Sequence, residues 1–368
     1  MFNKGFDKKK LFLILSLVHL GFYLILGSFP DIFAANRERP DSLFDPVVPF
    51  SADEINIDDA FQPPSWQFHN HFLGTDNLGR DVLAGIIYGC RTSLLVSLPA
   101  MSIAAIFGIS LGLMGGYFGN SGIKFNYIGL FVYSLAALLG YYYGFYLSQF
   151  SIIEGFEQSS FAGIVQLTKS STISVLFFIF AFLIKKIIEK VIKPVQNFNF
   201  PVDEIVLKLT ELFSSIPRFI LILSLAAFVK PSLGVLVLII GFTSWTGMTR
   251  LIRGEILKIK NLQYIEAGKA LGLTDKSILF KYILPNAIPS AIVAFTFGLA
   301  NLLALEATLS FLGIGLPPDF ISWGKIISSV RYNLSAWWLA VFPGIYLSLT
   351  VLALHNCSNY LLDKMNRR

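Results

Sequence analysis

Charged residues are scarce in this chain. Of its 368 residues, 14% are Asp, Glu, Lys or Arg and 54% are hydrophobic, and the mean hydropathy is +0.65. Soluble domains carry about 25% charged residues, so the composition excludes a soluble domain and indicates a polytopic membrane protein. The net charge is +6, but most Lys and Arg lie in short segments beside apolar runs, as in cytoplasmic loops. This charge therefore gives no reason to expect nucleic acid as a partner.

Three kinds of site are also missing. The phosphate-binding pattern G-x-x-x-x-G-K-[ST] does not occur, so the chain has no such loop for ATP. The two cysteines, Cys90 and Cys357, have no metal-like spacing and lie near or inside apolar runs, which favours packed free thiols. No cluster of acids, histidines or metal ligands suggests a membrane-embedded enzyme. We therefore expect no catalytic residues, no metal and no other cofactor.

The apolar runs predict an all-α, polytopic membrane helix bundle of about eight transmembrane helices. The first run, residues 11–29, is about 28 Å long as a helix, close to the thickness of a bilayer core. We interpret it as an uncleaved helix, because residues 33–35 form a poor cleavage site and the run is long for a signal peptide. The other runs occupy residues 93–118, 125–150, 172–184, 202–229, 233–249, 287–311 and 336–362.

The Lys and Arg residues beside the apolar runs indicate how the chain is oriented in the membrane, and the runs themselves divide it into regions. Lysines 8–10 precede the first run, and Lys364, Arg367 and Arg368 end the chain, so the positive-inside rule places both termini in the cytoplasm. The predicted divisions are a first helix (1–29), an external loop (30–91), a core helix rich in small residues (92–119), an insertion (120–200) and a second core region (201–368). The run 202–229 begins amphipathic, and we expect it to turn into the bilayer near Pro217.

A polar, lysine-rich stretch, residues 262–285, separates two later apolar runs. Its sequence predicts a helical hairpin on the cytoplasmic side. The first helix should cover residues 262–271 and end at Gly272, and the second should follow Thr274 as N-cap. We expect Pro285 to interrupt the helix where the chain returns to apolar sequence.

This stretch resembles the EAA loop of ATP-binding-cassette (ABC) importer permeases. The usual form is Glu-Ala-Ala, three residues, Gly, nine residues and Ile-x-Leu-Pro. In this chain Gly268 replaces the second Ala and Tyr282 replaces the Ile. The resemblance implies that the loop couples the permease to a separate ATPase, which binds the ATP. It assigns the coupling role to Glu266, Ala267, Gly268, Gly272, Leu284 and Pro285. For Glu266 the alternative is a solvated helix charge.

A second resemblance lies near the end of the predicted external loop. The matching residues there are Gly74, Thr75, Asp76, Gly79, Arg80 and Asp81. They resemble a segment typical of the dipeptide, oligopeptide and nickel branch of these permeases, although the same residue types also form Asx-capped turns. Three later segments resemble the same branch: LSFLG (residues 309–313), SWG (322–324) and FPG (342–344). His69 and His71 have no further ligands nearby, so we expect hydrogen-bonded or solvent-exposed histidines there and no metal site.

Residues 120–200 depart from the family pattern. The family usually passes directly from the end of the core helix to the next core segment, whereas this chain adds two apolar runs followed by lysines. Two added spans preserve the orientation of everything downstream. We therefore predict a permease core of six helices with an inserted two-helix hairpin.

Glu306 is a carboxylate well inside an apolar run, where a charge is costly and usually faces the bundle interior. It could line the translocation path or pin two helices together, and the alternative is hydration near the outer interface.

The resemblance implies a multi-pass permease of the plasma (inner) membrane, of the second-permease type, in an ATP-driven importer for dipeptides, oligopeptides or nickel. The implied partners are a homologous permease, two ATP-binding-cassette ATPase subunits, an external substrate-binding protein and the membrane lipid. A permease itself catalyses no reaction. The alternative function is an ion-gradient-driven secondary transporter, but we see neither paired intramembrane charges nor an obvious inverted repeat.

Overall fold

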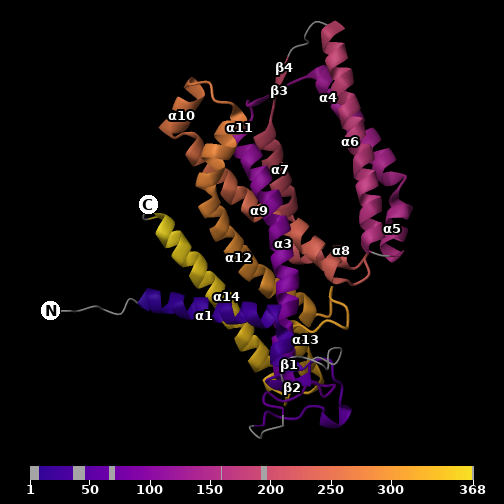
Figure 1. Ribbon diagram of the computed structural model, residues 1–368, viewed down its shortest axis with the longest axis vertical. Coiled ribbons are helices and arrows are strands. Elements are labelled where there is room, and N and C mark those ends of the chain that lie inside the picture. Colours follow the sequence, from indigo (N-terminus) through magenta and orange to yellow (C-terminus); the bar gives the residue numbers. More distant parts are fainter. Residues whose placement is uncertain (1–7, 36–45, 66–70, 159, 192–196, 367–368) are drawn as a thin grey trace, which may run out of the picture. The chain divides into compact units, whose positions relative to one another are not determined.

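The computed structural model describes residues 8–35, 46–65, 71–158, 160–191 and 197–366. The chain forms two compact units, one made of Met1–Tyr117 with Val206–Arg368 and the other of Phe118–Ile205. Both are helical, and the described residues contain only two small sheets of two strands each (Figure 1). The predicted all-α membrane bundle is therefore confirmed.

Seven helical segments of the described chain are long and apolar enough to cross a membrane. Five belong to the first unit and two to the second: Lys10–Ser28, Val82–Phe118, Leu233–Lys260, Asp275–Phe311 and Trp338–Met365, then Tyr127–Tyr146 and Val165–Ile188. The run 202–229, which we expected to be the eighth, forms two shorter helices, α7 (Val202–Ser215) and α8 (Arg218–Ala226). They separate at Pro217, because proline lacks the amide proton that would continue the helix. A break therefore lies where we expected a turn, and entry into the bilayer at this point stays a prediction.

The first unit holds most of the secondary structure. Before α7 and α8 it contains, in chain order, α1 (Lys8–Ser28), α2 (Pro30–Phe33), β1 (Ala34–Ala35), β2 (Val48–Ser51), the 3₁₀ helix η1 (Ile57–Asp59) and α3 (Val82–Phe118). After them come α9 (Leu233–Lys260), α10 (Gln263–Ala270), α11 (Asp275–Ile278), the π-helix η3 (Leu279–Ile283), α12 (Leu284–Phe311), α13 (Trp323–Ser328), the 3₁₀ helix η4 (Ser329–Tyr332) and α14 (Trp338–Asn366). Strands β1 and β2 pair in parallel.

Helix α3 starts ten residues earlier than the predicted core helix. The carboxylate of Asp81 accepts a hydrogen bond from the backbone N–H of Ala84 at 2.7 Å and so caps the helix. The first turns are then buried in the core, which the polar flanks of this segment did not suggest. Further along, the small residues of α3 let α9 approach closely: an added Cβ on Gly112 would lie 2.9 Å from the carbonyl oxygen of Thr249.

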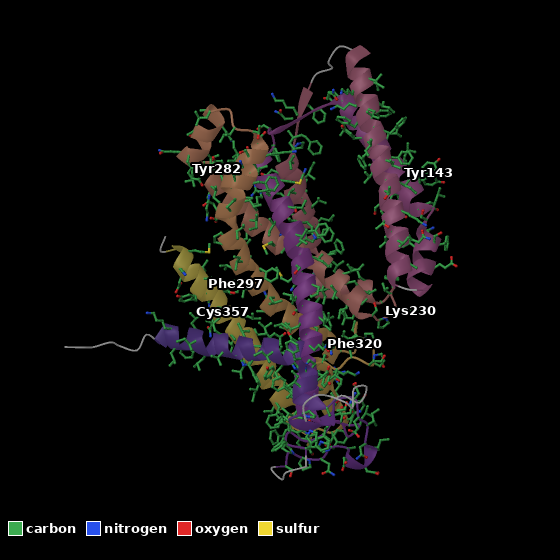
Figure 2. The ribbon with its side chains drawn as sticks, in the orientation of Figure 1. Tyr143, Lys230, Tyr282, Phe297, Phe320 and Cys357 are labelled. Carbon is green, nitrogen blue, oxygen red and sulfur yellow. The ribbon has the colours of Figure 1, made fainter. Side chains whose placement is uncertain are left out.

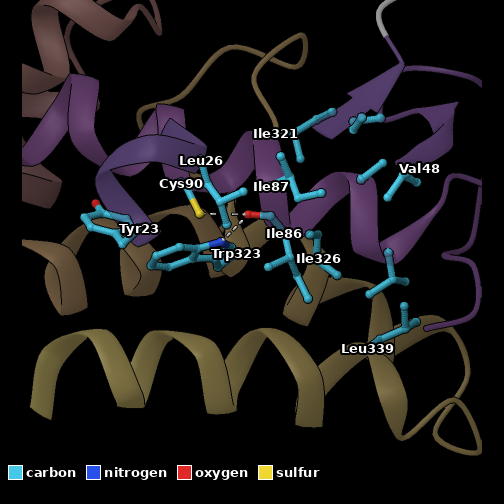
Figure 3. Packing of buried hydrophobic residues seen from close by; sticks show 14 of the residues in the cluster. Tyr23, Leu26, Val48, Ile86, Ile87, Cys90, Ile321, Trp323, Ile326 and Leu339 are labelled. Carbon is cyan, nitrogen blue, oxygen red and sulfur yellow. Dashed lines mark hydrogen bonds between the residues drawn. The ribbon is translucent and has the colours of Figure 1, made fainter. Parts of the chain in front are cut away.

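The hydrophobic core lies where α1, α3, α13 and α14 meet (Figure 3). Trp323 is fully buried at its centre, and its indole N–H donates to the carbonyl oxygen of Ile86 at 3.0 Å. Tyr23 and Tyr346 pack their rings near this indole, at centroid distances of 6.0 and 5.3 Å. The SWG segment is therefore part of the core, and it ties the connection after α12 to the start of α3.

The second unit is a helical hairpin closed by a short sheet. It contains β3 (Ile123–Asn126), α4 (Tyr127–Tyr141), the π-helix η2 (Tyr142–Tyr146), α5 (Gln149–Gln158), α6 (Ser160–Val191) and β4 (Asn197–Phe200). The two strands pair antiparallel with Ile123 opposite Phe200, so the ends of the hairpin meet. The limits of this unit, residues 118 and 205, lie two and five residues from those predicted for the insertion.

Candidate functional site

The EAA-like loop starts with a short helix that ends at a glycine. Helix α10 stops at Ala270, and Gly272 has φ +77°. The N–H of Leu273 donates to the carbonyl oxygen of Gly268 at 3.1 Å, and that of Gly272 donates to Lys269 at 3.0 Å. These two bonds form a Schellman motif, in which the left-handed residue is usually glycine. The prediction that this helix ends at Gly272 is confirmed.

The same motif explains why glycine stands at position 268. Gly268 is buried, and an added Cβ would lie 3.2 Å from Cδ1 of Leu273. This is the apolar contact that accompanies a Schellman turn, and it is tight for an alanine. The departure from the usual Glu-Ala-Ala is therefore matched by the bulky Leu273 that folds back onto the helix.

The chain returns to the membrane through one continuous helix. The hydroxyl of Thr274 accepts from the N–H of Ser277 at 3.4 Å, as expected of an N-cap. From Asp275 the chain stays helical to Phe311, so the expected interruption at Pro285 is wrong. The preceding turn, Leu279–Ile283, is a π-helix. A π-helix has hydrogen bonds from residue i+5 to residue i, and this wider turn allows the helix to continue through Pro285, which has no N–H to donate.

One face of this loop is open to a partner. Glu266 and Ala267 are exposed on α10, and Leu271 is 83% exposed. Lys269, Lys276 and Lys281 are exposed as well, Pro285 is exposed, and Leu284 is half-buried. An exposed carboxylate and a protruding leucine among lysines can form ion pairs and an apolar anchor with another subunit.

The loop is also fastened to the end of α3, by Tyr117. The Tyr117 hydroxyl donates to Oδ1 of Asp275 at 2.5 Å, and Nζ of Lys260 donates to the Tyr117 carbonyl oxygen at 2.7 Å. Nζ of Lys269 lies 5.5 Å from the centre of the same ring, within the range of a cation–π contact. Three parts of the loop region thus meet at one side chain, which is 4% exposed.

Glu306 is fully buried in α12. The hydroxyl of Ser310 donates to its Oε1 at 2.8 Å, and the hydroxyl of Ser93, on α3, is 3.4 Å from Oε2. These donors offset part of the cost of removing a carboxyl group from water. A residue that lines a path shared with a second subunit would be exposed in a single chain. The geometry therefore favours the helix-joining role that we expected for Glu306 and speaks against the alternative, hydration near the outer interface.

The SWG segment closes over this carboxyl group. Ser322 is fully buried, and its hydroxyl accepts from the N–H of Lys325 at 3.3 Å to cap α13. At Gly324 an added Cβ would lie 2.0 Å from the carbonyl oxygen of Ala307, one residue after Glu306. Only glycine allows this approach of two backbones.

The segment that resembles the peptide and nickel branch forms a compact turn ahead of α3. Asp76 is 3% exposed, and its Oδ1 accepts from the N–H groups of Leu78 and Arg80 at 2.8 and 3.0 Å. The Arg80 guanidinium binds the other carboxylate oxygen at 2.6 and 2.8 Å. Burial lowers the pKa of the nearby Lys325, and Arg80 lowers it further. The Asx turn that the sequence offered as the alternative for this segment is present, together with an ion pair.

The remaining residues of this segment hold it against the core. Thr75 is fully buried, and its carbonyl oxygen accepts from the indole of Trp338 at 3.1 Å. Gly74 and Gly79 have φ +79° and +74°. His71 donates through Nδ1 to Asp81 at 2.8 Å, so this histidine is hydrogen-bonded as expected, while His69 lies outside the described residues. These contacts stabilise the turn and the start of α3.

Sequence reasoning identified the loop but missed its attachment. Tyr117 stands 158 residues before Asp275, and no local pattern connects them. The signal that could have drawn attention to it is the sequence Gly-Tyr-Phe-Gly at residues 116–119, the end of the predicted core helix, where we placed only the start of the insertion. Ser93 was likewise considered only as the first residue of the apolar run 93–118.

The comparisons with known proteins point to one class. Residues 191–368 match the family described as "Binding-protein-dependent transport system inner membrane component". The dipeptide transport system permease protein DppC of Haemophilus influenzae is 26% identical over 324 residues, covering 87% of this chain and 83% of that protein. DppC of Bacillus subtilis is 25% identical over 322 residues (87% and 75%). The glutathione transport system permease protein GsiD of Pectobacterium atrosepticum is 24% identical over 322 residues (87% and 79%).

The membrane-helix fold, the exposed loop and these matches define the permease subunit of an ABC importer. Within that class, residues 191–368 carry the match to the binding-protein-dependent transport system inner membrane components, and over 87% of its length the chain is similar to DppC. The resemblance found in the sequence is confirmed. The region that matches the family includes both the EAA-like loop and Glu306.

Proposed function

We propose that this chain forms part of the translocation path of an importer for short peptides and couples it to an ATPase through residues 262–285. It pairs with a homologous permease and receives its cargo from an external substrate-binding protein. Two ATPase subunits bind and hydrolyse the ATP, and this chain catalyses no reaction.

The observation that carries the proposal is the geometry of the loop. One face presents Glu266 and Leu271 to a partner, while Tyr117 fastens the loop to a membrane-spanning helix. A displacement at the exposed face is thus passed into the bundle. The printed names of the relatives, dipeptide and glutathione permeases, favour short peptides as cargo. They also speak against an ion-gradient transporter, since the matched family is binding-protein-dependent.

The proposal counts α7 and α8 together as an eighth crossing beside the seven long helices. It then places both termini and the loop in the cytoplasm, and it places outside residues 30–81, the part of the predicted external loop (30–91) that precedes α3. In a variant without Cys90 and Cys357, single cysteines at the exposed positions Asp58 and Lys276 report the two sides. We expect a membrane-impermeant maleimide added to intact cells to label Asp58→Cys only, and Lys276→Cys to react only after the cells are opened. Equal labelling of both positions from outside would contradict this orientation.

The coupling role predicts a loss of uptake in Glu266→Lys. Reversing an exposed charge creates repulsion where a partner provides a complementary surface. In proteoliposomes loaded with ATP and assembled with partner permease, ATPases and binding protein, we expect dipeptide uptake to fall more than about tenfold, equivalent to about 1.4 kcal/mol. The amount of co-purified ATPase should fall as well, with the level of this chain unchanged.

The matched control is Glu211→Lys, the same charge change at an exposed position of α7 outside the loop. It should keep wild-type uptake. Full uptake by Glu266→Lys with the ATPase still bound would refute the coupling role. Uptake that requires an ion gradient and not internal ATP would refute the proposal that the chain is part of an ATP-driven importer.

A further inference from the structure

Helices α8 and α9 hold an arginine at a depth of the membrane where side chains are usually apolar. Arg218 begins α8, which has nine residues and is about 13 Å long, and Lys230 lies beyond the other end of α8, away from the EAA-like loop (Figure 2). Nη1 of Arg218 donates to Oγ of Ser244 at 3.4 Å, and Ser244 lies about 9 Å before Arg250 along α9. A bilayer core is about 30 Å thick. In the proposed topology the Arg218 guanidinium therefore lies inside the core, between Lys230 on the external side and Arg250 near the cytoplasmic side.

The arginine stands on a side of this helix pair that is polar and open. Ser214, at the end of α7, is exposed, and Ser244 is half-buried. Gly247 is exposed and follows Ser244 by three residues, so the two are neighbours on the surface of α9. No atom lies within 4 Å of an added Cβ on Gly247. Two exposed apolar residues, Leu238 and Phe242, form a row on a different side of α9. That row suits lipid, whereas a charged side at this depth requires water or another polar group.

Arg218 is the cation on this side whose hydrogen-bond donors are mostly unused. A guanidinium has five N–H donors. Within the part of the chain that the structure describes, the Arg218 group makes one hydrogen bond, to Ser244, and has no carboxylate oxygen within 4 Å. Arg250 differs, because its Nη2 donates to Oγ of Ser214 at 2.6 Å and to the carbonyl oxygen of Thr210 at 3.4 Å, and so it ties α9 to α7. A charged side chain at membrane depth usually faces the bundle interior or an aqueous pathway.

We propose that Arg218 binds the terminal carboxylate of the cargo peptide as the peptide passes this side of α8 and α9. The inference rests on the proposed function, in which the chain forms part of the path for short peptides. A peptide with a free C-terminus ends in a carboxylate whatever its side chains are, and the planar guanidinium binds a carboxylate through two parallel hydrogen bonds. An ion pair exposed to water is weak, so the cargo is held only briefly. The same charge repels a bare divalent cation, which favours peptides over nickel.

The first test asks whether this side is aqueous and positively charged. In the importer assembled from all its subunits in lipid nanodiscs, with Cys90 and Cys357 replaced by serine, Gly247→Cys supplies a single thiol in this chain. Mass spectrometry follows its reaction with sulfonatoethyl methanethiosulfonate, an anion, and with the trimethylammonium analogue, a cation, each relative to a free thiol in solution. We expect the anion to be favoured, and Arg218→Gln to lower the anion-to-cation ratio of rates at least about fivefold. One unit charge has this effect on two such reagents at roughly 8 Å in water.

The second test asks whether the peptide carboxylate is the group that is bound. A dipeptide with a free C-terminus should slow the modification of Gly247→Cys, and its C-terminal amide at the same concentration should not. In ATP-loaded proteoliposomes Arg218→Gln should lower the maximal rate of dipeptide uptake several-fold, with the peptide affinity of the binding protein and the amount of co-purified ATPase unchanged. Arg218→Lys keeps the charge but not the two parallel bonds, so it should keep the reagent ratio and recover only part of the uptake.

The matched control is Lys230→Gln, which removes an exposed cation of the same crossing outside the core and should keep the wild-type ratio and uptake. If the wild type imports no dipeptide, the proposed function is wrong. If it does, but Arg218→Gln leaves the ratio or the uptake unchanged, or the dipeptide and its amide protect the thiol equally, this inference alone is overturned. Lipid or a helix of the partner permease over this side would keep both reagents from the thiol, which also overturns it.

Discussion

Gly272→Val is expected to reach normal levels in the membrane and to lose at least about nine-tenths of its dipeptide uptake. Gly272 has φ +77° in the Schellman turn that ends α10. A left-handed conformation costs an L-residue roughly 1–2 kcal/mol, and a β-branched side chain tolerates it worst. The turn will open, and Glu266 and Leu271 will leave the positions that the proposed contact with the ATPase requires. The glycine is exposed with no atom within 4 Å of an added Cβ, so only the backbone conformation is affected.

The control for this prediction is Gly272→Asn, since asparagine is the residue that most often replaces glycine in such a turn. It should retain most of the uptake and most of the bound ATPase. Equal activity of the valine and asparagine variants would mean that the conformation of this turn does not matter for coupling. If the valine variant is lost from the membrane, the glycine is needed for folding of the protein and not specifically for coupling.

Gly324→Ala is expected to reduce the amount of protein in the membrane several-fold. Its added methyl group would lie 2.0 Å from the carbonyl oxygen of Ala307 and 2.9 Å from the backbone nitrogen of Phe311. Backbone atoms cannot rotate away as side chains do, so α13 has to move off α12. Trp323 then leaves the core, and the site around Glu306 opens. Overpacking of this kind costs about 1–3 kcal/mol, enough to change cellular abundance several-fold.

Quantitative immunoblotting of membranes measures this effect, with Gly344→Ala as the matched substitution. Gly344 lies in α14 with no atom within 4 Å of an added Cβ, so alanine should be accepted there at the wild-type level. Wild-type amounts of the Gly324→Ala protein would show that α13 and α12 do not have to touch.

The sequence was sufficient to predict the helix ends in the EAA-like loop that depend only on bonds between neighbouring residues. Gly272 and Thr274 mark a helix end and a helix start by their own backbone and hydroxyl bonds, and both were read from the sequence. Pro285 was misread because the rule that proline ends a helix assumes regular α-helical bonding before it. A π-turn over residues 279–283 removes that assumption.

The remaining errors come from contacts between distant residues. The start of α3 is flanked by polar residues in the sequence, yet it is buried by α1, α13 and α14. These helices are distant in the sequence, so the local pattern of polar and apolar residues could not predict the burial. The same holds for Ser93 beside Glu306, 213 residues apart. The sequence predicted that Glu306 was an unusual carboxyl group, but its partners follow only from the packing of α3 against α12.

Helix α3 has fixed contacts at both of its ends. Asp81 joins its start to the turn of residues 74–81, and Tyr117 joins its end to the EAA-like loop. With 37 residues it is a rod of roughly 55 Å, and tilting such a rod by about 5° moves its far end by about 5 Å. Leverage of this size would let a small rotation at the ATPase reach the opposite rim of the importer within one element. Pro99 lies near the midpoint, and a bend at that weakened turn would shorten the lever arm by about half.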